Sequence, residues 1–346
     1  MSRLFRSAQS KAASDIHIQP LANGGADVSL RLDGVITPAE TLDSDVASLV
    51  IGRIKYLAKL KTYEHSVPQD GRISHQDADI DQELRVSSYP TVSGEKIVVR
   101  FFTENQVQTL DQLGLDLDAY STIDSFLQQR QGLMLLTGPS GSGKTTTIYG
   151  CLAQLAQQVG RHIITVEDPV EQLIPGIMQT EVNEPRGLTY PKSIRHLMRQ
   201  DPEVIVIGEI RDDETAEIAV RAALTGHQVI ATLHAGSCQG VIDRLRVMVS
   251  DRYAMASVLQ VIVNQRLIRR LCSECSGTGC SACSQTGYRG RVPIVETLSL
   301  DDKLRLEVQQ EIPSSSKPQP TLQEAALKLV QLGVTSEQEV QRIIGT

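Results

Sequence analysis

The sequence predicts an α/β protein of two domains, and three observations lead to this prediction. Apolar runs of four or five residues alternate with helical periods from about residue 130 to residue 235, as the strands of a buried parallel sheet do. The first hundred residues instead alternate polar and apolar positions in shorter runs, which is typical of a half-buried sheet. The chain has 346 residues, more than a single hydrophobic core usually organises.

The first domain, residues 1–103, is expected to be small and of α+β type. Segments such as Val28–Leu32 and Ile97–Arg100 predict strands, and Asp45–Lys61 predicts a helix. Residues 1–14 lack an apolar run of signal-peptide length, and no segment of the sequence is apolar enough to span a bilayer. We therefore expect a soluble protein that is not secreted.

The second domain, residues 111–346, follows a polar linker, 104–110, and begins with a predicted helix near Leu117–Gln129. Its predicted strands each end in polar or glycine residues; they are Leu133–Leu136, His162–Val166, Val204–Ile207 and Gln228–Thr232. Ligands of parallel sheets bind along this carboxyl edge.

The C-terminal part of this domain is expected to be helical from Met248 on. Two closing helices are predicted from capping residues, Thr321 with Glu324 and Thr335 with Gln338. The Ser/Pro-rich segment 313–320 is expected to be a flexible linker.

A phosphate-binding loop follows the first predicted strand. The segment Gly138–Thr145 matches G-x-x-x-x-G-K-[ST] between a buried strand and a helix, the context that such a loop requires. Backbone N–H groups would surround the β-phosphate of ATP, Lys144 would reach the β and γ oxygens, and Thr145 would bind Mg²⁺. The residues predicted to bind nucleotide here are Gly138, Pro139, Ser140, Gly141, Ser142, Gly143, Lys144, Thr145 and Thr146.

Phosphoryl transfer to water also needs a carboxylate that orients the water. Glu209, at the end of the third apolar run, is predicted to be this residue, with Gly208 in place of the usual aspartate. Glu167 is the predicted helper carboxylate for Mg²⁺ or its water; a turn-forming Asp168-Pro169 pair is the alternative interpretation of that segment. His227 and His234 flank the next strand, and each is either a γ-phosphate sensor or a structural histidine.

Four cysteines within twelve residues predict a structural zinc site. Cys272, Cys275, Cys280 and Cys283 form two C-x-x-C pairs in the segment 264–291, enough ligands to close a tetrahedral Zn²⁺ site. Reduced, metal-free thiols are the alternative.

Nearly the whole chain resembles the ATPase family of type II secretion and type IV pilus assembly, which includes pilus extension, retraction and competence-pilus motors. The resemblance rests on the phosphate-binding loop and on colinear blocks, which are Ala13–Ile18, Arg31–Gly34, Pro68–Arg72, Thr165–Glu171, Arg199–Pro202, Gly208–Asp212, Thr225–His227 and Leu233–Ala235. It implies a RecA-like core and a PAS-like first domain.

The resemblance also implies roles for particular residues. Glu167 lies in the family's Asp box, Glu209 is its Walker B glutamate, and His227 and His234 form its His box. Arg85 and Arg100 match two arginines that the first domain projects toward the nucleotide; ordinary strand-edge arginines are the alternative.

At the level of the machine, the resemblance implies a homo-hexamer in the cytoplasm, held peripherally at the inner face of the membrane by platform and accessory proteins. Paired C-x-x-C motifs favour an assembly role, although the four-residue spacer here is shorter than the family's. The match begins by Ala13, as in short competence-type members, so we expect either a short form or a truncated chain.

Other functions stay open at this point. A competence-pilus motor is the alternative within the family, and a RecA-like nucleic-acid translocase is the main alternative outside it. The net charge of −7, the absence of Trp and the four Phe residues disfavour nucleic-acid binding, so no direct nucleic-acid partner is expected. A nucleotide-dependent adaptor and a small-molecule kinase are weaker alternatives.

Overall fold

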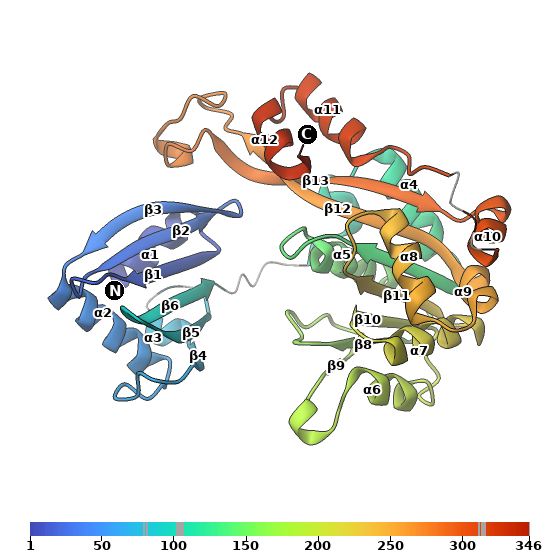
Figure 1. The fold of residues 1–346 in the computed structure, drawn as a ribbon, viewed down its shortest axis with the longest axis horizontal. Helices are drawn as coiled ribbons and strands as arrows, with labels where there is room; N and C mark the ends of the chain where they lie inside the picture. The colour runs from blue at the N-terminus through green and yellow to red at the C-terminus, as the bar shows by residue number, and fades with distance from the viewer. Residues whose placement is uncertain (79, 81, 102–106, 311, 313–315, 346) are drawn as a thin grey trace. The chain divides into compact units, whose positions relative to one another are not determined.

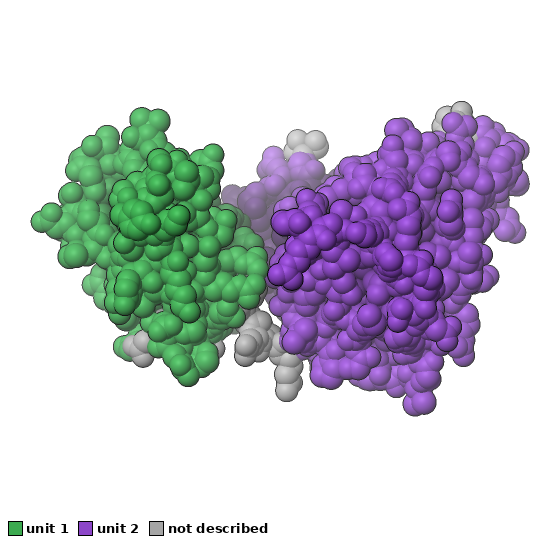
Figure 2. Space-filling view, turned by 90° about the horizontal axis from the view of Figure 1, so that it is seen from below, with its two compact units in different colours: residues 1–105, 271–290 green, residues 106–270, 291–346 purple. Residues whose placement is uncertain are grey.

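The computed structural model describes residues 1–346 except 79, 81, 102–106, 311, 313–315 and 346 (Figure 1). It contains two compact units, shown in green and purple in Figure 2. Unit 1 comprises Met1–Asn105 and Leu271–Gly290, and unit 2 comprises Gln106–Arg270 and Arg291–Thr346. Residues 104–106 of the predicted linker and 313–315 of the predicted Ser/Pro linker lie outside the described residues. The domain boundaries drawn from the sequence stay a prediction.

Unit 1 is built on a six-stranded antiparallel sheet of order β3-β2-β1-β6-β5-β4. Alternate side chains of the strands are buried with residues of helices α1 and α2, among them Phe5 and Ile54, because the side-chain period of a strand is two. The strands are β1 (Asp15–Pro20), β2 (Ala26–Leu32), β3 (Val35–Leu42), β4 (Gln69–Ile73), β5 (Leu84–Thr91) and β6 (Gly94–Phe101). The helices are α1 (Ser2–Ser10), α2 (Ser44–Leu57) and α3 (His75–Ala78).

Unit 2 contains a seven-stranded sheet of order β13-β12-β7-β11-β10-β8-β9, in which all neighbouring pairs from β12 to β9 are parallel. The strands are β7 (Gly132–Thr137), β8 (Ile163–Glu167), β9 (Met178–Glu181), β10 (Val204–Ile210), β11 (Gln228–Leu233), β12 (Leu259–Leu271) and β13 (Tyr288–Ser299). This sheet confirms the predicted α/β class with a RecA-like core.

Helices cover both faces of this sheet. Leu133 and Leu135 of β7 pack with residues of α6 to α10, whereas Met134 and Leu136 pack with residues of α4 and α5. Every residue of β7 is buried, as expected for a strand between two helical layers. The helices are α4 (Leu117–Leu127), α5 (Lys144–Ala156), α6 (Tyr190–Leu197), α7 (Asp213–Leu224), α8 (Cys238–Met248), α9 (Arg252–Val258), α10 (Asp302–Gln309), α11 (Leu322–Gln331) and α12 (Glu337–Ile344).

Two local predictions for the C-terminal part are wrong. Between Met248 and the cysteine cluster the chain forms helix α9 and then the long strand β12 instead of continuing as helix, because the apolar stretch from Leu259 pairs with β7. The Thr321 capping box is present, but the next helix is capped by Ser336, whose side chain accepts the Glu339 N–H. Thr335 instead donates its hydroxyl to Arg269 O at 2.8 Å.

Among the described residues, no helix has both the length and the apolar character that crossing a bilayer requires.

Candidate active site

The phosphate-binding loop connects β7 to α5, as predicted. Gly138, Gly141 and Gly143 all have positive φ, and Gly143 is the N-cap of α5. A Cβ at Gly138 would lie 2.4 Å from Gln265 O, so strand β12 also requires glycine there. Lys144 Nζ donates to Gly138 O at 2.8 Å and to Pro139 O at 3.0 Å, and burial lowers the pKa of Lys144. The loop therefore holds its own lysine in place.

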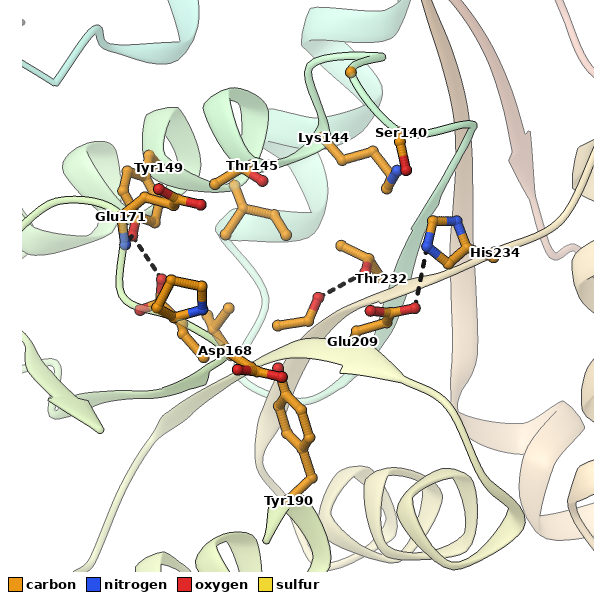
Figure 3. Close-up of a pocket in the computed structure, with 16 residues that line it drawn as sticks. Ser140, Lys144, Thr145, Tyr149, Asp168, Glu171, Tyr190, Glu209, Thr232 and His234 are labelled. Carbon is orange, nitrogen blue, oxygen red and sulfur yellow. Dashed lines mark hydrogen bonds and ion pairs between the residues drawn. The ribbon is translucent and has the colours of Figure 1, made fainter. Parts of the chain in front are cut away.

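A cavity of about 250 Å³ opens beside this loop at the carboxyl ends of β8, β10 and β11 (Figure 3). Its lining comprises Ser140, Gly141, Lys144, Thr145, Ile148, Tyr149, Glu167, Asp168, Pro169, Glu171, Tyr190, Val206, Gly208, Glu209, Thr232 and His234. Seven residues predicted from the sequence thus line one cavity: Ser140, Gly141, Lys144, Thr145, Glu167, Glu209 and His234.

Glu209 is held from two sides. Its Oε1 lies 3.1 Å from His234 Nε2, and its Oε2 accepts from Arg211 Nε at 3.0 Å. Arg211 also donates from Nη1 to Asp168 at 3.1 Å, and its pKa is raised, chiefly by the hydrogen bond to Glu209. Both oxygens of the predicted catalytic carboxylate are therefore engaged by the chain itself.

His234 also faces the phosphate-binding loop, since its Nδ1 lies 3.3 Å from Gly138 O. Arg244 donates to His234 O at 2.6 Å. His234 thus lies between the loop that is expected to hold the phosphates and the carboxylate that is expected to orient water.

The structure does not bring His227 to this cavity. His227 precedes β11, whereas His234 follows its carboxyl end, so the length of the strand separates the two residues. The Nδ1 of His227 lies 2.9 Å from Ala222 O, an intrahelical carbonyl at the end of α7. This geometry supports the structural interpretation of His227 within one chain. Thr146, in the first turn of α5, is exposed and is also absent from the lining.

Gly208 leaves no room for the usual aspartate. A Cβ at this position would lie 2.9 Å from Tyr190 Oη, 3.1 Å from Val166 O and 3.3 Å from Glu167 Cα. Separations this short require the neighbours to move. The sequence shows only that the aspartate is missing, and the packing explains why.

Glu167 is buried, with 6 % of its surface exposed. Tyr149 Oη donates to its Oε2 at 2.6 Å, and Thr165 Oγ1 and Gln179 Nε2 donate to its Oε1. This carboxylate is surrounded by donors of the chain, which the sequence did not predict.

Several lining residues were not predicted as functional, among them Tyr149, Tyr190 and Thr232. Tyr149 lies five residues after Lys144, on a part of α5 beyond the motif, and Thr232 Oγ1 donates to Gly208 O at 2.6 Å. Burial raises the pKa of both tyrosines strongly. The only sign of these residues in the sequence is the presence of polar residues within otherwise apolar segments.

Arg85 and Arg100 lie in unit 1 and face each other on β5 and β6. Arg100 also pairs with Asp15, and its Nε donates to Asp15 Oδ1 at 2.8 Å. Although burial raises the pKa of Asp15, the hydrogen bonds from Arg100 and Ser14 bring it below the usual value. The two arginines thus share the sheet face opposite the unit's apolar core, and their contact with nucleotide stays a prediction.

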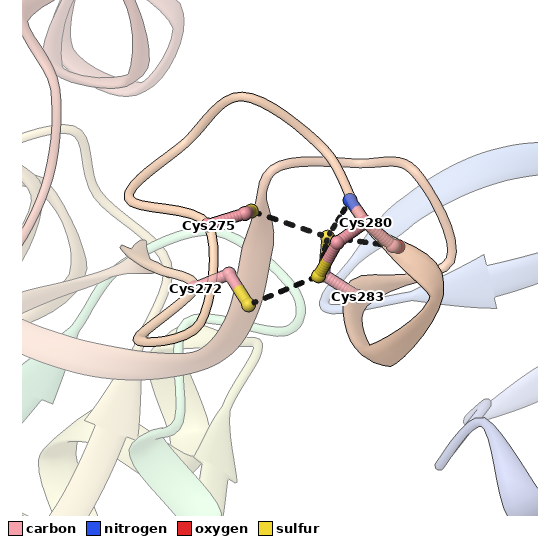
Figure 4. Close-up of side chains that lie close together, drawn as sticks. All are labelled: Cys272, Cys275, Cys280 and Cys283. Atoms are coloured by element: carbon pink, nitrogen blue, oxygen red, sulfur yellow. Dashed lines mark hydrogen bonds between the residues drawn. The ribbon is translucent and has the colours of Figure 1, made fainter.

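The four cysteines come together at the turn between β12 and β13 (Figure 4). Their Sγ atoms all lie within 4.8 Å of one another, and the hydrogen-bonded pairs are 3.7 to 3.9 Å apart. Four thiolates at about 2.3 Å from a tetrahedral Zn²⁺ would be separated by about 3.8 Å. The donor set therefore fits zinc.

Backbone N–H groups point at these sulfur atoms. Gly279 N lies 3.3 Å from Cys275 Sγ, and the amides of Cys280 and Gly287 lie 3.2 and 3.3 Å from Cys283 Sγ. Although desolvation raises the pKa of Cys283, these N–H donors bring it to about 6. At Cys283 the thiolate form, which binds a metal, is thus favoured.

A family model described as "Type II/IV secretion system protein" matches residues 1–342. The chain is 36 % identical to "Putative type II secretion system protein E" of Escherichia coli, over 99 % of the chain and 76 % of that protein. It is 36 % identical to "Type II secretion system ATPase E" of Vibrio cholerae, over 99 % and 74 %. It is 37 % identical to "Type IV pilus assembly ATPase PilB" of Thermus thermophilus, over 98 % of the chain but only 42 % of that protein.

Solved structures show the same fold. The ATPase DotB of Legionella pneumophila superposes with a TM-score of 0.75 at 21 % identity, over 99 % of this chain and 94 % of that one. The pilus retraction motor PilT with bound ADP superposes with a TM-score of 0.63 at 26 % identity, over 99 % and 92 %. Together with the family match over nearly the whole length, these similarities confirm the predicted resemblance: the chain belongs to the type II/IV secretion system protein family.

Proposed function

We propose that the chain hydrolyses ATP to drive the assembly of a type II secretion pseudopilus or a type IV pilus. The observation that carries the proposal is the convergence of Lys144, Thr145 and Glu209 on one cavity at the carboxyl edge of the sheet. The expected enzyme class, an ATP hydrolase, is confirmed by relatives that are named as ATPases.

In this proposal the loop 138–145 surrounds the β-phosphate with backbone N–H groups. Lys144 would exchange the carbonyls of Gly138 and Pro139 for phosphate oxygens, and Thr145 would hold Mg²⁺, which when bound would supply positive charge beside the phosphates. Glu209 orients the attacking water once it is released from Arg211, and His234 lies where it can respond to loss of the γ-phosphate. Uncharged donors on the loop then stabilise the leaving diphosphate.

The larger assembly is also part of the proposal. Six chains form a ring, and Arg85 and Arg100 approach the phosphates so that hydrolysis depends on the position of unit 1. The ring works in the cytoplasm and is held to the inner face of the membrane by platform and accessory proteins. The tetracysteine cluster binds one structural Zn²⁺ per chain, as its Sγ spacing and N–H donors support.

The test compares wild type with Glu209→Gln and with Glu337→Gln, an exposed glutamate of α12. ATP hydrolysis is measured with and without single-stranded and duplex DNA, and zinc content is measured on the same samples. Because Gln keeps the shape of Glu but not its charge, we expect Glu209→Gln to bind ATP and to hydrolyse it at least 100-fold more slowly. Glu337→Gln should match wild type, and each chain should contain about one zinc.

Three outcomes would change the proposal. Turnover at the wild-type rate in Glu209→Gln would remove Glu209 from its role. Strong stimulation by DNA would favour the translocase alternative. Absence of zinc would leave the cysteines as reduced thiols.

A further inference from the structure

The hydroxyl of Tyr149 has a place in the cavity wall that the nucleotide-binding motifs do not explain. Tyr149 lies in the second turn of α5, after Lys144 and Thr145 of the same helix, and only 6 % of its surface is exposed. Figure 3 shows its side chain reaching toward the segment that follows β8.

Three hydrogen bonds saturate this hydroxyl. It lies 2.6 Å from Glu167 Oε2, 3.1 Å from Glu171 N and 3.3 Å from Gln172 N. The two backbone N–H groups can only donate, so the phenolic proton must point to the carboxylate of Glu167. The direction of all three bonds is thereby determined.

The carboxylate of Glu167 is an anchor for this arrangement. Its second oxygen accepts from Thr165 and Gln179, so the chain supplies donors to both oxygens. A carboxylate held in this way is ill suited to leave its donors for a metal, since buried charged hydrogen bonds are costly to break.

Side-chain contacts link this segment to Glu209, the predicted catalytic residue. Asp168 follows Glu167 directly and accepts from Arg211, which in turn holds Glu209. The Tyr149 hydroxyl on α5 therefore holds the backbone that carries Asp168, where these contacts begin.

We propose that Tyr149 is a positioning residue, whose hydroxyl ties helix α5 to the segment 167–172 and thereby places Asp168, Arg211 and Glu209. This inference rests on the proposed ATP hydrolysis. In this proposal Glu167 does not bind the metal directly. It forms part of a structural link between helix α5, which binds the nucleotide, and Glu209, which orients the water.

The experiment uses Tyr149→Phe, which removes only the hydroxyl, beside Tyr253→Phe, the same change at a tyrosine of α9 that is 69 % exposed. Steady-state ATP hydrolysis and binding of a fluorescent ADP analogue are measured on the full chain. We expect kcat of Tyr149→Phe to fall about tenfold or more, since the bond involves a charged group, while ADP affinity changes less than about threefold. Tyr253→Phe should match wild type.

Glu167→Gln and the double variant Tyr149→Phe/Glu167→Gln test whether Tyr149 acts through Glu167. If it does, the double variant is no slower than Glu167→Gln by more than about twofold. Fully multiplicative losses, or a Tyr149→Phe enzyme with wild-type kcat, would overturn the proposal.

Amide hydrogen exchange provides a readout that does not depend on turnover. Tyr149→Phe should speed exchange at Glu171 and Gln172, which lose their acceptor, and Tyr253→Phe should not. A wild-type protein that fails to hydrolyse ATP would refute the proposed function. The exchange rates of the Glu171 and Gln172 amides would then be the only test of the positioning role. Unchanged exchange there would refute it.

Discussion

At Gly208, adding a single Cβ atom would displace residues that line the cavity. Its backbone carbonyl accepts from Thr232, while its Cα faces Tyr190 and the backbone of Val166 and Glu167. The residue lies between three elements that each contribute to the site. A side chain at this position would therefore meet both α6 and the end of β8.

We predict that Gly208→Ala lowers both stability and hydrolysis. The added Cβ would meet backbone atoms that cannot rotate away, which should cost about 1–3 kcal/mol of unfolding free energy. Gly52→Ala is the matched control, because a Cβ there meets nothing within 4 Å and alanine favours a helix interior. Urea unfolding and ATP hydrolysis of the three proteins measure both effects. Wild-type values for Gly208→Ala would show that the strands can separate at no cost.

Individual residues were predictable to different degrees. Lys144, Thr145 and Glu209 could be assigned because each lies at a set distance from a strand end, and the structure brings them to one cavity. Tyr149 and Arg211 could not be assigned, because their contacts are with residues 18 and 43 positions away. Side-chain hydrogen bonds between distant segments leave no periodic trace in a sequence.

At the scale of elements, helix α12 is attached to β12 through one buried glutamate. Glu339 has 1 % of its surface exposed. It pairs with Arg269 at 2.7 Å and with Arg342 at 2.6 Å. Although burial raises the pKa of Glu339, the hydrogen bonds from these arginines bring it to about 2. The terminal helix is thus held electrostatically as well as by apolar packing.

This ion-pair cluster should make stability depend on pH. The folded pKa of Glu339 is below the unfolded value of 4.5, so its contribution is fully present above about pH 5 and is lost as the pH falls toward 2. We predict that Glu339→Gln lowers the unfolding free energy by about 2 kcal/mol at pH 7, and by much less at pH 3. Urea unfolding at both values, with Glu337→Gln as control, measures the difference. An equal loss at the two pH values would contradict the prediction.

Elements differ in how far the sequence predicts them. The four apolar runs become β7, β8, β10 and β11, because a strand buried on both faces needs an uninterrupted apolar run. Strand β12 was missed since it passes from a buried interior to a polar end that contains three arginines. The cap of α12 differed from its prediction by one residue, because Thr335 and Ser336 are chemically equivalent caps and only tertiary contacts choose between them.

At the scale of the molecule, the proposed ring makes a prediction about mass. With Mg²⁺ and a non-hydrolysable ATP analogue, light scattering should give six times the 37.9 kDa of one chain. Bound nucleotide should favour the ring because ligand that binds the assembled state stabilises it. A mass that stays at one chain over the accessible concentration range would contradict the hexamer. Lys144→Ala, which removes the phosphate contact, is the control and should assemble less.

The division into units could be predicted only in part. The change from alternating to continuous apolar runs near residue 105 marks the end of the first sheet, because strand burial differs between the two sheets. Nothing in the local composition indicates that residues 271–290 group with the first 105. Such grouping depends on contacts across the sequence, which neither periodicity nor motif spacing records.

The strand order of each sheet also determines when a strand can find its neighbours during synthesis on the ribosome. The first sheet pairs strands that all end by Phe101, so its partners emerge early. Strand β7, in contrast, pairs with β12. Thr137 of β7 lies opposite Asn264, which is synthesised roughly 125 residues later. At about 5–20 residues per second, this interval is on the order of 6–25 seconds. Its other neighbour, β11, also emerges late in this interval, so for most of that time the strand that leads into the phosphate-binding loop has no sheet partner. The nascent chain therefore exposes unpaired apolar strand edges in the middle of its translation, which favours aggregation.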